Sequence, residues 1–184
     1  MINVDEQLYR WSGEEKLQEI DKTLETLFNN IFITNINLND IIIKVCVLND
    51  LYSTQIFDTF SMARHIYGLN IDEDLEKGNF DLIDKIAQCK IGDKTRNFYS
   101  FATKYCSHHY PEKFAIYDSY VAYALNHFNK KDPFHKFKKS DLKNYFVFME
   151  TITAFIKKNS LFKYSLKEID KFLWTCGKEL KNKN

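Results

Sequence analysis

The sequence predicts an all-α fold, in which residues 1–184 form a single compact domain of several helices. Three observations lead to this fold class. Apolar residues recur at three- and four-residue steps in several segments, which is the spacing of one helix face. The chain contains only 5 Gly and 2 Pro, and we find no hairpin signals that would pair strands. Its length is that of one domain, without a linker composition that would divide it.

Two helices are expected early in the chain. Residues 14–29 carry one apolar stripe at helical spacing. Residues 38–49 are nearly all apolar in their middle (IIIKVCVL) and are the best candidate for a strand. A buried helix capped by Asn39 or Asp40 is favoured, because the chain offers no partner strand.

The central segments alternate between short helices and turns. Ser53 is expected to cap a helix that runs to about Tyr67 and ends at Gly68. The acidic connector IDEDLEKGN leads to a short helix over residues 80–89. The sequence KIGDK, residues 90–94, predicts a turn, and residues 95–108 return to helical spacing.

Three further helices are expected toward the end of the chain. The first begins near Asp118 and runs to about Phe128, before the loop NKKDPFHKFKK. The second covers residues 140–158 with Ser140 as its cap. The third covers residues 165–178, where Ser165 and Glu168 have the spacing of a capping box.

The composition excludes several classes of protein. The N-terminal sequence has neither the basic start nor the apolar run of a signal peptide, and no stretch approaches the ~18 apolar residues of a spanning helix. The four cysteines are widely spaced and form no CxxC pair, so we expect small buried thiols in a reducing cytoplasm. Neighbouring His108 and His109 point about 100° apart on a helix, so we expect no metal site.

Charge is divided unevenly along the chain. Residues 1–84 contain 6 Lys and Arg against 16 Asp and Glu, whereas residues 85–184 contain 20 against 9. The nearly neutral total therefore combines an acidic first half with a basic second half. Such a basic half could meet a polyanion, although a Lys-rich helix can also be an ordinary solvated surface.

Three short segments could carry chemistry. The glycine turn Gly92-Asp93-Lys94-Thr95, if it opens a helix, would direct backbone N–H groups toward a phosphate, although an ordinary interhelical turn with a solvent-facing lysine has the same composition. Asp118 follows an apolar run (FAIY) at a helix start, where it could cap the helix, orient a water molecule or stabilise a cationic sugar carbon.

The third segment is the polar corner NDLYSTQ, at the end of the apolar helix. Asn49, Tyr52 and Gln55 are of the types that hold an extruded nucleobase by stacking and hydrogen bonding. Helix capping and turn formation explain the same residues equally well.

Taken in chain order, these segments resemble the helix-hairpin-helix superfamily of base-excision DNA glycosylases, which includes endonuclease III, adenine mismatch glycosylase and 8-oxoguanine glycosylases. The resemblance covers roughly residues 38–180. IIIKVCVLNDLYSTQI is similar to the helix that ends at the base pocket, and KIGDKT to the hairpin. KFAIYDSYVAYAL is similar to the element that carries the catalytic aspartate, and IDKFLWTCGKEL to a late helix of the family.

The resemblance implies an all-helical glycosylase fold and a role for each matching residue. Asp118 would be the catalytic carboxylate, and Lys94 the Schiff-base nucleophile of an enzyme that is both glycosylase and lyase. Lys104 is the rival lysine. Gly92, Lys94 and Arg96 would hold the phosphates of double-stranded DNA, from which a damaged purine would be removed. No cysteine array for an iron–sulfur cluster is present, so no cofactor is expected.

Two other functions are compatible with the same sequence. One is a non-catalytic module that keeps the scaffold and the DNA affinity without the chemistry. The other is a helical protein-interaction adaptor that uses its aromatic side chains as an interface.

Overall fold

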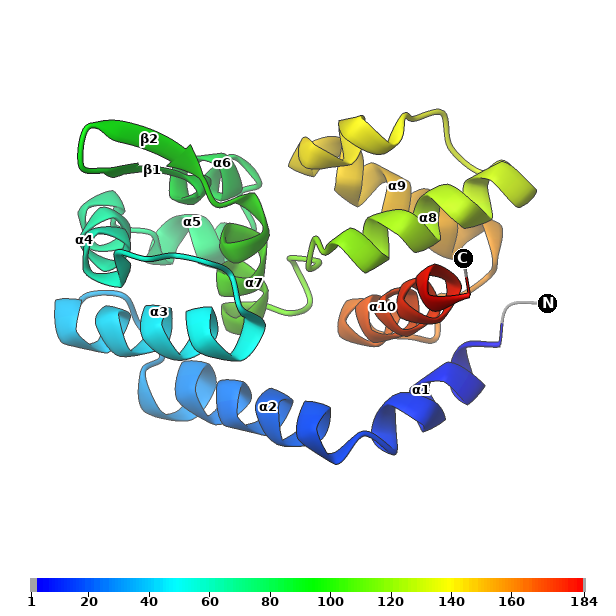
Figure 1. The fold of residues 1–184 in the computed structure, drawn as a ribbon, viewed down its shortest axis with the longest axis horizontal. Coiled ribbons are helices and arrows are strands. Elements are labelled where there is room, and N and C mark those ends of the chain that lie inside the picture. The colour runs from blue at the N-terminus through cyan, green and yellow to red at the C-terminus, as the bar shows by residue number, and fades with distance from the viewer. Residues whose placement is uncertain (1–2, 184) are drawn as a thin grey trace. The chain divides into compact units, whose positions relative to one another are not determined.

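The structure is a computed structural model that describes residues 3–183, and it is mostly helical (Figure 1). The all-α class predicted from the sequence is confirmed at this level, with one two-stranded sheet added among the described residues. The chain divides into two compact units. Unit 1 comprises the described residues up to Leu17 together with those from Ala115 onward, and unit 2 comprises Gln18–Phe114. The single all-helical domain over residues 1–184 stays a prediction.

Unit 2 contains most of the short elements, and α2 enters it from unit 1. Its elements are α2 (Glu15–Thr26), the π-helical η1 (Leu27–Ile31), α3 (Leu38–Tyr52), α4 (Thr59–Leu69), α5 (Asp72–Lys77), α6 (Asp81–Ala87), β1 (Gln88–Ile91), β2 (Lys94–Asn97) and α7 (Tyr99–His109). Helix α3 packs against α4 and α7, and α6 packs against α7. The helix favoured over a strand for residues 38–49 is confirmed, although Asn37 caps it rather than Asn39 or Asp40.

Unit 1 combines the N-terminal helix with the last third of the chain. Its elements are α1 (Val4–Ser12), α8 (Ser119–Lys131), the 3-10 helix η2 (Lys139–Lys143), α9 (Tyr145–Lys158) and α10 (Leu166–Asn182). Helix α10 lies beside α8 and also packs against α1 (Figure 1). Aromatic rings fill the core of this unit: Phe128 stacks with Phe155 and Phe172 at centroid distances of 5.5 and 6.1 Å.

Of the other capping residues that the sequence predicts, two are confirmed and two are wrong. Asp118 caps α8, and Ser165 forms the capping box of α10 with Glu168. Ser53 does not start a helix: it ends α3 in a left-handed conformation, and Asp58 caps α4 instead. Ser140 lies inside η2, and Asn144 caps α9. In both wrong cases another Asp or Asn lies a few residues further along and makes the capping hydrogen bond.

The largest error of the sequence prediction concerns residues 88–97. They form an antiparallel hairpin of β1 and β2, and α7 begins only at Tyr99, not at Thr95. The two-residue turn contains Gly92 at φ +59°, a value that suits glycine at the first central position of such a turn. The glycine turn therefore does not open a helix, and the predicted phosphate site at a helix N-terminus lacks its structural basis.

The cysteines are free thiols and only partly follow the prediction. Cys89, Cys106 and Cys176 are buried, as expected for small apolar side chains, but Cys46 is exposed. Burial raises the pKa of the Cys176 thiol to about 12 and that of Cys106 further. The buried thiols are therefore protonated at neutral pH and are poor nucleophiles.

Candidate functional site

The polar corner at the end of α3 is a tight turn held by one side chain. Asn49 Oδ1 accepts hydrogen bonds from the Ile56 amide (2.9 Å) and the Thr54 hydroxyl (2.8 Å), and its Nδ2 donates to the Ile56 carbonyl (3.2 Å). Ser53 and Gln55 both adopt left-handed backbone conformations, at φ 50° and 62°. Non-glycine residues pay for such conformations in free energy, so the turn is strained and Asn49 stabilises it.

Helix α7 brings three polar side chains to this turn. Lys104 Nζ lies 5.2 Å from the centre of the Tyr52 ring and donates a 2.6 Å hydrogen bond to Ser100 Oγ. Tyr52 Oη lies 3.1 Å from His108 Nε2, within hydrogen-bond distance. We refer to Tyr52, Ser100, Lys104, His108 and the turn 53–56 as the α3–α7 corner.

Burial within the α3–α7 corner is graded. Lys104 is only 4% exposed and His108 7%, whereas Tyr52 and Ser100 are half-buried and Gln55 is exposed. The corner therefore presents an aromatic ring and a hydroxyl at its edge, with an amine and an imidazole behind them. This arrangement can stack a planar group on Tyr52 and hold or move a proton between Tyr52 and His108.

Asn49, Tyr52 and Lys104 all lie at the α3–α7 corner or directly beside it in unit 2. The hairpin residues Gly92, Lys94 and Arg96 are not part of this corner. Lys94 and Arg96 are exposed on β2, opposite Ile91 and Cys89, and Gly92 is exposed in the turn. Of the two rival lysines, Lys94 is thus exposed and Lys104 is almost entirely buried.

Asp118 belongs to unit 1 and is half-buried at the start of α8. One of its carboxylate oxygens accepts a 2.8 Å hydrogen bond from the Tyr120 amide, as an N-cap does. The preceding backbone is fixed at two points: Asp170 accepts from the Ile116 amide (2.8 Å), and the Tyr145 hydroxyl donates to the Ala115 carbonyl (2.9 Å). Asp118 is therefore presented by a rigid segment.

Sequence reasoning missed a buried polar cluster centred on Lys44 of α3. Lys44 is fully buried, and Nζ lies 3.1 Å from the Phe32 carbonyl and 2.8 Å from the Thr34 carbonyl. Nζ also lies 2.7 Å from Asn35 Oδ1 and 3.2 Å from His109 Nε2. Burial lowers the pKa of Lys44 to about 8 and holds the pKa of His109 well below its ordinary value.

The Lys44 cluster is best explained as structural. Asn35 ties it together, because its side-chain oxygen also accepts from the Tyr105 hydroxyl (2.6 Å) and its amide nitrogens donate to Asp72. The cluster pins the segment before α3 to α3, α5 and α7 with its polar atoms turned inward. A lysine in the middle of the apolar run IIIKVCVL was the sequence signal that pointed to it.

Phe57 is a second feature that sequence reasoning missed. It follows the strained turn directly and is 91% exposed, although it is a large apolar side chain. Among the described residues it is the most exposed of several large apolar side chains at the surface.

Two classes of site receive no support from the described residues. Between residues 3 and 183, no group of three or more His, Cys, Asp or Glu side chains is placed to hold a metal ion. In the same range, no helix combines the length and apolar character needed to cross a bilayer.

Comparison with known proteins relates the chain to one family. Residues 3–113 match the family model HI_0787_N, described as an N-terminal domain. An uncharacterized protein of Haemophilus influenzae is 45% identical over 144 residues, which are 77% of this chain and 69% of that protein. No solved structure matches the chain. The matched segment ends one residue before unit 2 does. The chain therefore belongs to the HI_0787_N family.

Proposed function

We propose that the protein binds DNA and acts on a damaged nucleotide in the manner of a base-excision glycosylase, with Lys104 as the nucleophilic lysine. The observation that carries this proposal is the position of Lys104: a lysine only 4% exposed, 5.2 Å from the ring of a half-buried tyrosine, at the corner where the sequence suggests a base pocket. Lys94, the other candidate, is exposed on a hairpin.

Burial matters because only the neutral amine attacks a carbon atom. Active-site lysines of this kind are taken out of water, which disfavours the ammonium form. Lys104 is almost entirely buried, whereas Lys94 is exposed. The edge of the site supports the same function, since Tyr52 offers a surface on which a base can stack and Phe57 can fill the gap that an extruded base leaves in the duplex.

The chemistry can be written for an abasic site, whose sugar is in equilibrium with an aldehyde. Lys104 Nζ attacks the aldehyde carbon C1′, the carbonyl oxygen leaves as water after two proton transfers, and an imine joins enzyme and DNA. Tyr52 Oη and His108 Nε2 are 3.1 Å apart, so this pair can pass a proton during these transfers. Borohydride adds hydride to the imine carbon and makes the link permanent.

A role for Asp118, as the carboxylate that stabilises positive charge on the sugar during base release, is implied by the sequence resemblance alone and is proposed independently of the Lys104 chemistry. Its support in unit 1 fits that role, because a catalytic carboxylate must be held still. The hydrogen bonds from Ile116 to Asp170 and from Tyr145 to Ala115 supply this rigidity just before Asp118.

The test is borohydride trapping with a duplex that contains one abasic site. Wild-type protein is expected to form a covalent adduct, and Lys104→Arg, which keeps a cation beside Tyr52, is expected to form none. Lys94→Met is the matched control and should trap like wild type. A denaturing gel measures the amount of adduct, and peptide mass spectrometry identifies the modified residue.

Asp118→Asn addresses base release separately. It retains an oxygen that can accept from Tyr120, so α8 keeps its cap. Release from a panel of damaged-purine duplexes should fall by at least 100-fold, in line with the loss of a key electrostatic group.

Two outcomes would contradict the proposal. One is an adduct that persists in Lys104→Arg, and the other is the absence of DNA binding by wild-type protein at low salt.

A further inference from the structure

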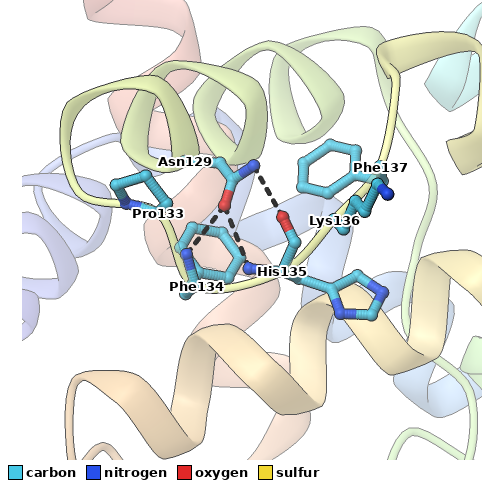
Figure 2. A pocket seen from close by; sticks show the side chains of 6 residues that line it. All are labelled: Asn129, Pro133, Phe134, His135, Lys136 and Phe137. Atoms are coloured by element: carbon cyan, nitrogen blue, oxygen red, sulfur yellow. Dashed lines mark hydrogen bonds between the residues drawn. The ribbon is translucent and has the colours of Figure 1, made fainter.

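Unit 1 has a surface pocket that includes neither Asp118 nor any residue of the α3–α7 corner. It has a volume of about 510 Å³ and is lined by one continuous segment and the helix end before it: Asn129, Pro133, Phe134, His135, Lys136 and Phe137 (Figure 2). It is a shallow hollow at the surface rather than an enclosed cavity. The pocket is open to solvent, and its lining combines aromatic rings with a cation.

Asn129 at the end of α8 gives the pocket a defined shape. Its Oδ1 accepts hydrogen bonds from the amides of Phe134 (2.9 Å) and His135 (3.1 Å), and its Nδ2 donates to the His135 carbonyl (2.9 Å), as Figure 2 shows. One side chain thus satisfies three backbone groups of the loop. The loop is preorganised, which lowers the entropic cost of binding a ligand there.

His135 and Phe137 form a pair of rings in the pocket. They are two residues apart, their ring planes differ by 26°, and their centroids are 6.2 Å apart. Phe134 contacts Phe137 at a centroid distance of 6.4 Å and packs on Phe155 of α9 at 5.4 Å, which anchors the loop to the core of unit 1. The outer pair is therefore held in place and offers flat surfaces for stacking.

The segment around these rings is strongly basic. Residues 129–139 contain five lysines, one aspartate and one histidine. The aspartate, Asp132, is paired with Lys158 of α9 at 3.0 Å, so its charge is balanced from outside the segment. Lys130, Lys131, Lys136 and Lys138 are exposed. A polyanion is the partner that this charge favours.

We propose that residues 129–139 form a binding site for an unpaired stretch of DNA, with a base stacked on His135 and Phe137 and the flanking phosphates on Lys136 and its neighbours. The choice of DNA rests on the proposed function. Aromatic rings alternating with lysines in a short extended segment match a chain of bases and phosphates, whereas an acidic peptide would not need the rings.

The experiment measures binding of the full chain to three fluorescein-labelled probes by anisotropy: a mixed 12-nucleotide single strand, its duplex, and a strand of the same length in which every base is missing. Wild-type protein should prefer the single strand with bases. Phe137→Ala should weaken binding to that strand roughly 5- to 150-fold, the range for one stacked base. The same variant should leave binding to the baseless strand unchanged.

The charge component has its own variant and control. Lys136→Ala should weaken binding to both single strands and lower the salt dependence of binding by roughly 0.7 per lost phosphate contact. Lys16→Ala, an exposed lysine on α2, is the matched control and should bind like wild type. Circular dichroism checks that each variant folds, and His135→Ala replaces Phe137→Ala if the latter does not.

The inference is overturned if Phe137→Ala loses the same factor in affinity for the strand with bases and for the strand without bases. It is also overturned if this variant binds both strands like wild type. The borohydride experiment fails or succeeds independently, because it reports a covalent bond at Lys104 in unit 2. If borohydride forms no adduct but Phe137→Ala weakens binding to the strand with bases, the proposed chemistry at Lys104 is wrong and the binding site in residues 129–139 stands. If an adduct forms but Phe137→Ala and Lys136→Ala bind like wild type, only the binding site is wrong.

Discussion

Lys44 is fully buried, yet its ammonium group is surrounded by oxygen and nitrogen atoms. An isolated buried charge costs several kcal/mol, and this cost is offset when hydrogen bonds replace the lost water. The carbonyls of Phe32 and Thr34 and the Asn35 side chain supply that replacement. The depressed pKa, about 8, indicates that the replacement is incomplete.

This pKa predicts how stability depends on pH. Because the folded-state pKa of Lys44 lies below its ordinary value of 10.5, the unfolded chain binds more protons between pH 8 and 10.5, and stability rises with pH in that window. From pH 8 to 9, wild type should gain about 1 kcal/mol relative to Lys44→Met. Urea unfolding of both proteins at each pH measures the difference.

The comparison with Lys44→Met is needed because other buried groups act in the opposite direction. The raised pKa values of Tyr105, Cys106 and Cys176 mean that the unfolded chain releases protons first above about pH 9, which lowers stability. These contributions are common to the two proteins. Parallel pH dependence in wild type and Lys44→Met would contradict the assignment to Lys44.

At the scale of elements, the hairpin of β1 and β2 is explained by local chemistry. Gly-Asp between two short runs is a hairpin turn signal that the helix prediction for this segment overlooked, and glycine adopts the positive φ that the turn requires. All four residues of β2 are exposed and none is strongly apolar, so the segment lacks the alternation of apolar and polar residues that would predict a strand. Cys89 of β1 is buried and β1 packs against α4, whereas β2 is exposed along its length.

The contact of α8 with α10 depends on Gly177. A Cβ atom built at this position would lie 2.1 Å from the Tyr120 carbonyl oxygen, in the first turn of α8. Gly177→Ala must therefore push the two helices apart, and we expect a loss of roughly 3 kcal/mol in the free energy of unfolding. Chemical denaturation measures the loss.

A matched control is available in α4. Gly68 is also within a helix, but nothing lies within 4 Å of a Cβ atom built there. Gly68→Ala should stabilise the protein by about 0.5 to 1 kcal/mol, because alanine has the higher helix propensity. Equal effects of the two substitutions would show that close helix contact at Tyr120 is unimportant.

At the scale of the whole molecule, the two compact units predict local responses to mutation. Gly177→Ala should reduce hydrogen-exchange protection in unit 1, and Lys44→Met in unit 2, with little change in the other unit. Amide exchange followed by mass spectrometry measures both. If each substitution lowers protection throughout residues 3–183, the chain unfolds as the single domain that its sequence predicts.

Part of the candidate site could be predicted from the sequence. Tyr52 and Asn49 stand at a polar corner after an apolar helix, and Asp118 has the position of an N-cap, so short-range patterns are enough to find them. The preference for Lys104 over Lys94 could not be predicted, because the sequence does not show which of the two lysines is buried. Burial distinguishes them, and burial depends on which helix packs against α3.

The sequence by itself determined the helical class, the apolar faces and most of the helix boundaries, because these depend on residues three or four positions apart. Only the tertiary structure decided which polar side chains share an environment, such as Lys104 with Tyr52 or Lys44 with His109. The physical reason is that desolvation and hydrogen bonding act between atoms that are close in space, and those residues are 52 and 65 positions apart in the chain.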